Sequence, residues 1–208
     1  MPTQATRRVA VFDGLLRLIH ARNALAILAL IATGLSADEF EHGGESAALW
    51  RLHIQFGYAL VGGLVARMLW GLVGPTSARW SDLWHPRAWL ATLRALPRLR
   101  LPQPRLGHDT LASAAFIAVY LTLAGMAITG LALAATEHNL GPLTHWLGDS
   151  LWLREYFKEP HEALYVLVAG FVALHLAALI GHQLFGKAPV AQAMLSGNQY
   201  LTTGDNHA

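Results

Sequence analysis

The chain has 208 residues, of which 54% are hydrophobic and only 13% are charged. That charged fraction is about half the share of a typical soluble domain, and the mean hydropathy is +0.36. The formal net charge is only +2, and cysteine is absent, which excludes disulfides, thiol chemistry, iron–sulfur clusters and covalently attached c-type haem.

Four long apolar segments account for this hydropathy. Each is long enough to cross a bilayer as a helix, which takes about 20 residues. In chain order they cover residues 15–36, 52–74, 111–135 and 163–186. These spans leave little chain for a soluble domain. The sequence therefore predicts an all-α integral membrane four-helix bundle, with residues 1–208 forming a single transmembrane domain.

The first span has an alternative interpretation as a signal peptide, because a basic start and an apolar stretch precede Leu35-Ser36-Ala37. However, Arg17, His20 and Arg22 crowd the start of the apolar region, and the span is long for a signal peptide. We therefore expect an uncleaved first span.

Basic residues are unevenly distributed between the two sides. With the N-terminus inside, eleven basic residues fall in the inner segments, three fall in the outer ones, and Arg67 lies within the second span. The inner ones are Arg7, Arg8, Arg17, Arg22, Arg79, Arg87, Arg94, Arg98, Arg100, Arg105 and Lys187; the outer ones are Arg51, Arg154 and Lys158. This excess places both termini in the cytoplasm and makes the basic loops topology signals rather than nucleic-acid-binding patches.

Two connections are expected to carry short interfacial helices. In the inner connection, residues 75–107, Pro86 can begin a helix that places Trp89 and Leu90 on one apolar face. Such an amphipathic segment lies in the membrane interface. The second outer loop, residues 136–160, is expected to lie along the outer surface.

The chain has 11 histidines, and four of them lie at two depths in the predicted spans. His161 and His175 are 14 residues apart, which in a helix is about 3.9 turns, so their rings point within roughly 40° of each other, about 21 Å apart along the axis. His53 begins the second span on the outer side, and His20 lies near the inner end of the first. Depth matching therefore gives an outer pair, His53 with His161, and an inner pair, His20 with His175. His182 is the alternative inner ligand on the last helix.

Two imidazoles facing each other across a bundle can ligate one haem iron from both sides, which suits electron transfer because no iron position stays open. The pattern thus predicts two b haems with these four histidines as iron ligands. Arg67 and Arg17 would neutralise propionates, and Arg22 could do the same. Arg67 could instead snorkel inward. Room for the macrocycles would come from Gly34, Gly57, Gly62, Gly63, Gly125, Gly130 and Gly170, although such glycines also pack helices.

Several short motifs carry a family resemblance from Val11 to about Gln199. They are Val11-Phe12-Asp13 ahead of Arg17 and His20, Leu52-His53 with Gly57-Tyr58, Arg67 with Trp70-Gly71 and Gly74, Gly107-His108, Thr129-Gly130, His161-Glu162 through His175, and Ala193-Met194 with Gly197. In these the chain resembles the prokaryotic cytochrome b561 family, which includes the b-type cytochrome subunits of nickel–iron hydrogenases.

The resemblance implies a four-helix protein of the bacterial inner membrane with two b haems. It implies that electrons pass between the quinone pool, ubiquinone or menaquinone, and a periplasmic or membrane redox protein. His20, His53, His161 and His175 match the family's ligand positions, whereas His108 matches a position that is not a ligand. Ala21 departs from the family, because an aromatic residue commonly follows the first ligand.

Other functions remain open from the sequence. The chain could be the anchor subunit of a larger oxidoreductase such as a hydrogenase, or a transporter whose histidines relay protons. Whether it is itself a quinone oxidoreductase, and whether it forms a homodimer, is also open. A quinone would bind either on the inner side, near His108 and Asp109, which we favour, or on the outer side, near His138, His145 and Trp146.

Overall fold

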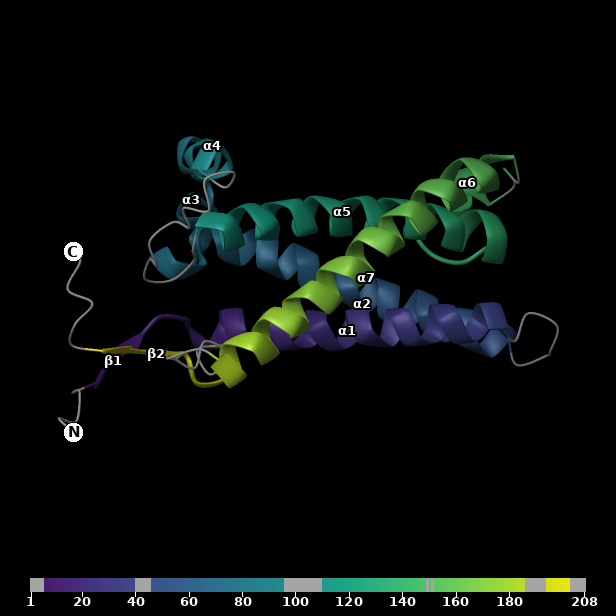
Figure 1. The fold of residues 1–208 in the computed structure, drawn as a ribbon. Helices are drawn as coiled ribbons and strands as arrows, with labels where there is room; N and C mark the ends of the chain where they lie inside the picture. Colours follow the sequence, from purple (N-terminus) through teal and green to yellow (C-terminus); the bar gives the residue numbers. More distant parts are fainter. Residues whose placement is uncertain are drawn as a thin grey trace. The chain divides into compact units, whose positions relative to one another are not determined.

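Four long helices dominate the computed structural model, which describes residues 6–39, 46–95, 110–148, 150, 152–185 and 194–202. They are α1 (Gly14–Glu39), α2 (Ser46–Val73), α5 (Thr110–His138) and α7 (Leu153–Phe185) (Figure 1). Each contains a stretch long and apolar enough to cross a membrane, and these stretches are Gly14–Ala37, Ser46–Val73, Ala112–His138 and Leu153–Gly181. The predicted all-α membrane fold with four spans is confirmed.

Short elements lie between and beside the long helices. They are η1 (Thr76–Ala78), α3 (Trp80–Leu83), α4 (Pro86–Ala95), α6 (Thr144–Leu147), and the strands β1 (Thr6–Ala10) and β2 (Asn198–Thr202). The helix α4 begins at Pro86, as predicted, because proline is already fixed at a helical φ and its missing N–H is not needed there. The two strands pair antiparallel, with Thr6 opposite Thr202. This pairing was not predicted, since both segments are short and far apart in the sequence.

Two compact units divide the chain. Unit 1 comprises residues 1–18, 69–117 and 172–208, and unit 2 comprises residues 19–68 and 118–171. The boundaries fall inside the four long helices, so each of these helices contributes to both units. The single-domain organisation of residues 1–208 stays a prediction.

The burial pattern is that of a protein solvated by lipid. Large apolar side chains face outward along the spans, for example Leu25 at 69% exposed and Leu174 at 74%. Polar side chains are buried instead, among them Asn23, Arg67 and Thr129. An aqueous protein avoids large exposed apolar surfaces, whereas a bilayer requires them.

The last helix begins ten residues before the predicted start of its span. Leu153, Tyr156 and Phe157 have the i, i+3, i+4 spacing of one helical face, which continues the helix outward. Pro160 lies inside α7, where its nitrogen cannot donate to the carbonyl of Tyr156, a defect that membrane helices tolerate. His161 therefore lies in the interior of a helix rather than at its first turn.

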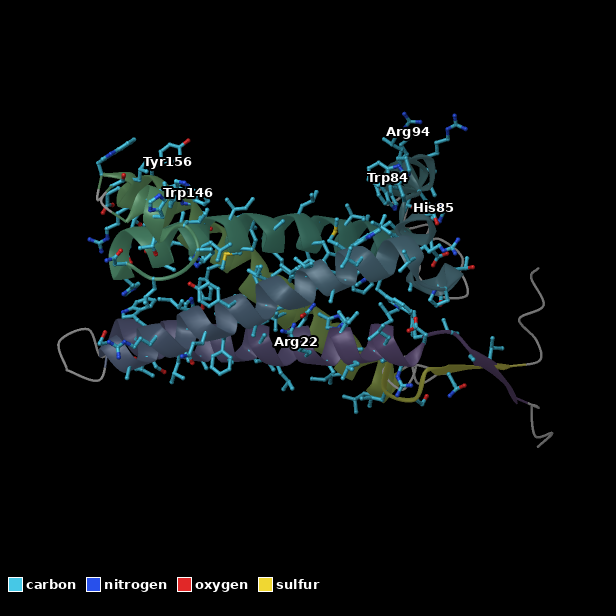
Figure 2. All side chains as sticks on the ribbon, turned by 180° about the vertical axis from the view of Figure 1, so that it is seen from behind. Arg22, Trp84, His85, Arg94, Trp146 and Tyr156 are labelled. Atoms are coloured by element: carbon cyan, nitrogen blue, oxygen red, sulfur yellow. The ribbon has the colours of Figure 1, made fainter. Side chains whose placement is uncertain are left out.

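The connection between α2 and α5 packs its tryptophans in unit 1. Trp84 and Trp89 meet edge to face with ring centroids 5.2 Å apart. The indole nitrogen of Trp89 donates to the hydroxyl of Ser113 at 3.0 Å, which ties α4 to the beginning of α5. Figure 2 shows Trp84, His85 and Arg94 on this connection, with the Arg94 guanidinium projecting away from the ribbon. The apolar and basic faces expected of an interfacial helix are thus both present.

Candidate cofactor-binding site

An apolar cavity in unit 2 contains about 530 Å³ of empty space. Its lining residues are Leu30, His53, Ile54, Gly57, Tyr58, Leu60, Val61, Met126, Ala127, Gly130, Leu131, Ala134 and His161. They come from all four long helices. Two imidazoles, from α2 and α7, and one phenol are its polar side chains, so the structure brings together the predicted outer pair of histidines.

The ring of His53 is held through its Nδ1 atom by α1. This nitrogen lies 3.2 Å from Thr33 Oγ1 and 3.1 Å from the carbonyl oxygen of Leu30. A carbonyl oxygen only accepts hydrogen bonds, so Nδ1 is the donor and carries the proton. The Nε2 lone pair of His53 is consequently available to a metal.

The ring of His161 is held in the same way by α5. Its Nδ1 atom lies 2.8 Å from Thr129 Oγ1, and the carbonyl of Met126 also accepts from the ring. Because the Thr129 hydroxyl donates its one hydrogen to the carbonyl of Gly125, Nδ1 is the donor to Thr129, and Nε2 of His161 is available as a ligand atom.

Glycines next to these threonines let both rings approach the helices closely. A β-carbon at Gly34 would lie 3.2 Å from His53 Cε1, and one at Gly130 would lie 3.1 Å from His161 Cε1. Gly57, which lines the cavity, has open space above it. Gly125 is different, since it accommodates Leu164 of α7. Of the glycines expected to make room for a macrocycle, Gly34, Gly57 and Gly130 lie at the cavity or its histidines, whereas Gly125 packs against a leucine.

These features fit a b-type haem. Its walls are apolar with few polar groups, as in most cofactor sites. Two neutral imidazoles with bonded Nδ1 atoms and available Nε2 atoms are the donor set of a bis-histidine iron.

Aromatic residues lie beside the cavity at its His53 end. Trp50 meets the His53 ring edge to face at 5.6 Å between centroids and lies 5.9 Å from the His138 ring. The buried hydroxyl of Tyr58 lies against Gly141, which has a φ of +96° and leaves no room for a side chain. That hydroxyl has no hydrogen-bond partner among the described residues. A tyrosine hydroxyl that donates to a polar group of a bound cofactor would lack a protein partner in this way.

Sequence reasoning missed Thr33 and Trp50 altogether and gave Thr129 and Tyr58 no role at the site. One signal was available in the sequence. The dipeptide Thr-Gly occurs in the first span at 33–34 and in the third span at 129–130. Each is followed by a span that carries a histidine of the outer pair.

The predicted inner histidines fall in different compact units. His20 belongs to unit 2 and His175 to unit 1, so their pairing stays a prediction. The side chain of the alternative ligand, His182, lies outside the described residues, as do His42, His108, Asp109 and His207.

Arg17 interacts with the C-terminal segment in unit 1. Its Nε donates to the carbonyl of Met194 at 3.1 Å, and its Nη2 donates to the carbonyl of Leu195. Next to them Gly197, with a φ of +80°, accepts from the backbone N–H of Val11 at 2.8 Å. Arg17 therefore holds the segment that leads into β2, which gives it a structural role beside the predicted cofactor contact.

Arg67 is 3% exposed, so its charge does not reach the surface of the protein. Its guanidinium lies 5.7 Å from the centroid of the Tyr120 ring and hydrogen-bonds the Tyr120 hydroxyl. Snorkelling, the alternative considered for this residue, is not what the structure shows.

A second polar group approaches α2 from α1. Arg22, seen in Figure 2, places Nη2 3.5 Å from the position of a β-carbon on Gly62. Beside it Asn23 lies against Gly63, and its buried Oδ1 has no hydrogen-bond partner in the described part of the chain. These two glycines thus make room for polar side chains. Sequence reasoning did not single out Asn23.

Comparison with known proteins agrees with this geometry. The model of the family described as prokaryotic cytochrome b561 matches residues 11–197. The chain belongs to the prokaryotic cytochrome b561 family. Three relatives are each named as a probable Ni/Fe-hydrogenase B-type cytochrome subunit. That of Bradyrhizobium diazoefficiens is 25% identical over 92% of this chain and 85% of its own; that of Cupriavidus necator is 26% identical over 90% and 85%; and that of Azotobacter vinelandii is 27% identical over 91% and 87%.

This cytochrome b561 family member is therefore a multi-pass membrane protein with b-type haem that functions in electron transfer. The predicted family and the predicted role as a b-type cytochrome in membrane electron transfer are confirmed.

Proposed function

We propose that this protein carries electrons across the bacterial inner membrane between two b haems. His53 and His161 would ligate the outer haem, and His20 and His175 the inner one. The observation that supports this most directly is the apolar cavity of unit 2, into which the outer pair faces with both Nε2 atoms available.

Haem b supplies one-electron redox chemistry when it is bound. The chain contributes the remaining properties of the site. His53 and His161 would both hold the haem iron and would leave no position on it for oxygen. The leucine and alanine walls exclude water, and a low local dielectric strengthens the hydrogen bonds that orient the rings.

Arg67 would neutralise a haem propionate, because it is a buried cation in the unit that contains the outer pair. The planar guanidinium group of arginine matches a carboxylate in bidentate geometry, so a propionate is a fitting partner for Arg67. Arg17 remains a proposed contact of the inner haem. Among the described residues, the tail carbonyls accept from two of its five N–H donors.

We further propose that both termini lie in the cytoplasm. Pairing of β1 with β2 supports a common side for the two terminal segments, as four spans require. The excess of basic residues in the inner segments supports the cytoplasmic side.

A quinone is the proposed partner on one side of the membrane and a redox protein the partner on the other. The names of the relatives favour a second candidate, in which the chain is the membrane subunit of a nickel–iron hydrogenase. Purification in mild detergent separates the two candidates. Large hydrophilic subunits would accompany a hydrogenase subunit, and a free cytochrome would purify alone.

The purified protein should show a reduced b-type spectrum with two low-spin haems per chain. His53→Ala and His161→Ala should each lower the haem content to one per chain, with the same haem lost in both. His138→Ala is the matched control, since His138 lies near Trp50 at the same end but does not line the cavity. A colourless protein from haem-replete cells, or two intact low-spin haems in His53→Ala, would refute the assignment.

A further inference from the structure

The two threonines that contact the outer histidines make the same set of hydrogen bonds. Thr33 Oγ1 lies 2.7 Å from the carbonyl oxygen of Ala29 and 3.3 Å from that of Leu30. Thr129 Oγ1 lies 2.9 Å from the carbonyl oxygen of Gly125 and 3.2 Å from that of Met126. In both helices the acceptors are therefore the residues four and three positions earlier.

These bonds fix the direction of the contact with histidine. A threonine hydroxyl has one hydrogen, which each of these donates to its own backbone. Its lone pairs then face the imidazole, so the ring nitrogen must donate. The carbonyl of Leu30, three residues before Thr33, also accepts from Nδ1 of His53, and the carbonyl of Met126, three residues before Thr129, accepts from the His161 ring. The threonine contact thus specifies one tautomer at each ring, and at His53 a second acceptor agrees with it.

We propose that Thr33 and Thr129 are positioning residues that orient the two axial histidines of the outer haem and lower its reduction potential. This inference rests on the proposed function. An N–H···O bond at Nδ1 makes Nε2 more basic, and a more basic ligand favours ferric over ferrous iron. Because Thr129 is only 8% exposed, water cannot replace its hydroxyl.

A glycine follows each threonine and lets the histidine ring approach the helix. Gly34 and Gly130 follow the threonines directly and allow the Cε1 edge of each ring to contact the helix. A Thr-Gly pair therefore provides both the acceptor and the space that it needs. Its occurrence in α1 and again in α5 gives the two axial ligands equivalent environments.

The simplest alternative is that the threonines only bond their own helices, as buried threonines often do. Thr136 serves as a matched control for this. It lies on α5, is 3% exposed, and donates to the carbonyl of Ala132 at 3.1 Å. It does not line the cavity.

The test is a redox titration of the purified holoprotein carrying Thr33→Val, Thr129→Val or both, with Thr136→Val as the control. Valine keeps the shape of the threonine side chain and removes the hydroxyl oxygen that accepts from the histidine. At a fixed potential each single variant should raise the reduced-to-oxidised ratio of one haem about tenfold, which for one electron is a 59 mV rise in midpoint. The other haem should not change. The position of the low-spin ferric electron paramagnetic resonance signal of the affected haem should also change, because the orientation of the histidine rings determines it.

Serine at either position keeps the hydroxyl, so Thr33→Ser and Thr129→Ser should retain the parental midpoints even if a valine variant loses haem. Unchanged midpoints in the valine variants, or a serine shift as large as the valine shift, would overturn the inference. Failure of the inference differs from failure of the proposed function. In the first case His53→Ala still removes one haem, whereas in the second it removes none.

Discussion

The side chain of Asp13 accepts a hydrogen bond from the indole nitrogen of Trp70 at 3.2 Å and so joins the beginning of α1 to the end of α2 in unit 1. The same carboxylate caps α1, because its Oδ1 accepts from the backbone N–H groups of Leu15 at 3.0 Å and Leu16 at 2.9 Å. Two motifs of the family resemblance, near residues 11–13 and 67–74, are thus in contact.

Asp13→Ala should lower stability by about 1–3 kcal/mol, since it removes a helix cap and leaves the indole N–H of Trp70 without its acceptor. The measurement is the temperature at which haem is released in detergent. Trp70→Phe removes the indole bond but keeps the cap, and should have a smaller effect. Equal losses in the two variants would mean that the cap contributes nothing.

Gly34→Ala and Gly130→Ala should disturb the outer haem. The new methyl group would lie 3.2 and 3.1 Å from the histidine rings, so each ring must shift by a few tenths of an ångström or the helices must separate. We expect an altered low-spin signal and lower haem retention. Gly170→Ala on α7 is the control for this haem, because Gly170 does not line the cavity of unit 2 and its new methyl group meets open space; it should leave the spectrum of the outer haem unchanged. A change in all three variants would point to a general effect on packing.

His175→Ala should remove the inner haem or make it high-spin, whereas His182→Ala should leave both haems low-spin. The main reason is the family resemblance, in which His175 matches a ligand position. Depth points the same way, because His182 would lie about 10 Å further along the helix, toward the aqueous boundary. Absorption and electron paramagnetic resonance spectra distinguish the variants. The reverse outcome would make His182 the ligand.

The two predicted propionate contacts should behave differently. Arg67→Gln removes a buried charge and should weaken haem retention without freeing the C-terminal segment. Arg17→Gln removes the donors to Met194 and Leu195 and should make the segment before β2 more sensitive to protease. Limited proteolysis and haem content measured on the same samples separate these effects. If Arg17→Gln loses haem and its tail remains protected, the cofactor contact of Arg17 outweighs its structural one.

His108→Ala should slow reduction by a quinol analogue while both haems stay bound and low-spin, because histidine can accept the quinol proton. In the double variant His138→Ala/His145→Ala the haems should be reduced at the parental rate. Stopped-flow absorbance at the haem band measures both. Slow reduction in the outer double variant alone would place the quinone site on the outer side.

The helix α7 shows why element boundaries were harder to predict than the elements themselves. The apolar run from Ala163 predicts a span, and the structure has one. The helix nevertheless begins at Leu153, because amphipathic residues outside the apolar region continue it through Pro160. Hydropathy detects the part of a helix that lipid surrounds and not the part that extends beyond it.

The sequence by itself determined the four spans and the family, because hydropathy and motif identity are properties of local sequence. It also predicted, from helical rise, the depth at which each of the four histidines lies. Only the tertiary structure decided which atoms meet. The contact of His53 with Thr33 joins residues 20 apart, and that of His161 with Thr129 joins residues 32 apart. Both depend on how each helix is rotated toward its neighbour. The tail contact of Arg17 depends in the same way on tertiary packing, since its partner Met194 is 177 residues away. Hydrogen bonds of this kind are directional and short-ranged, so the hydrophobic pattern that orders the helices does not specify them.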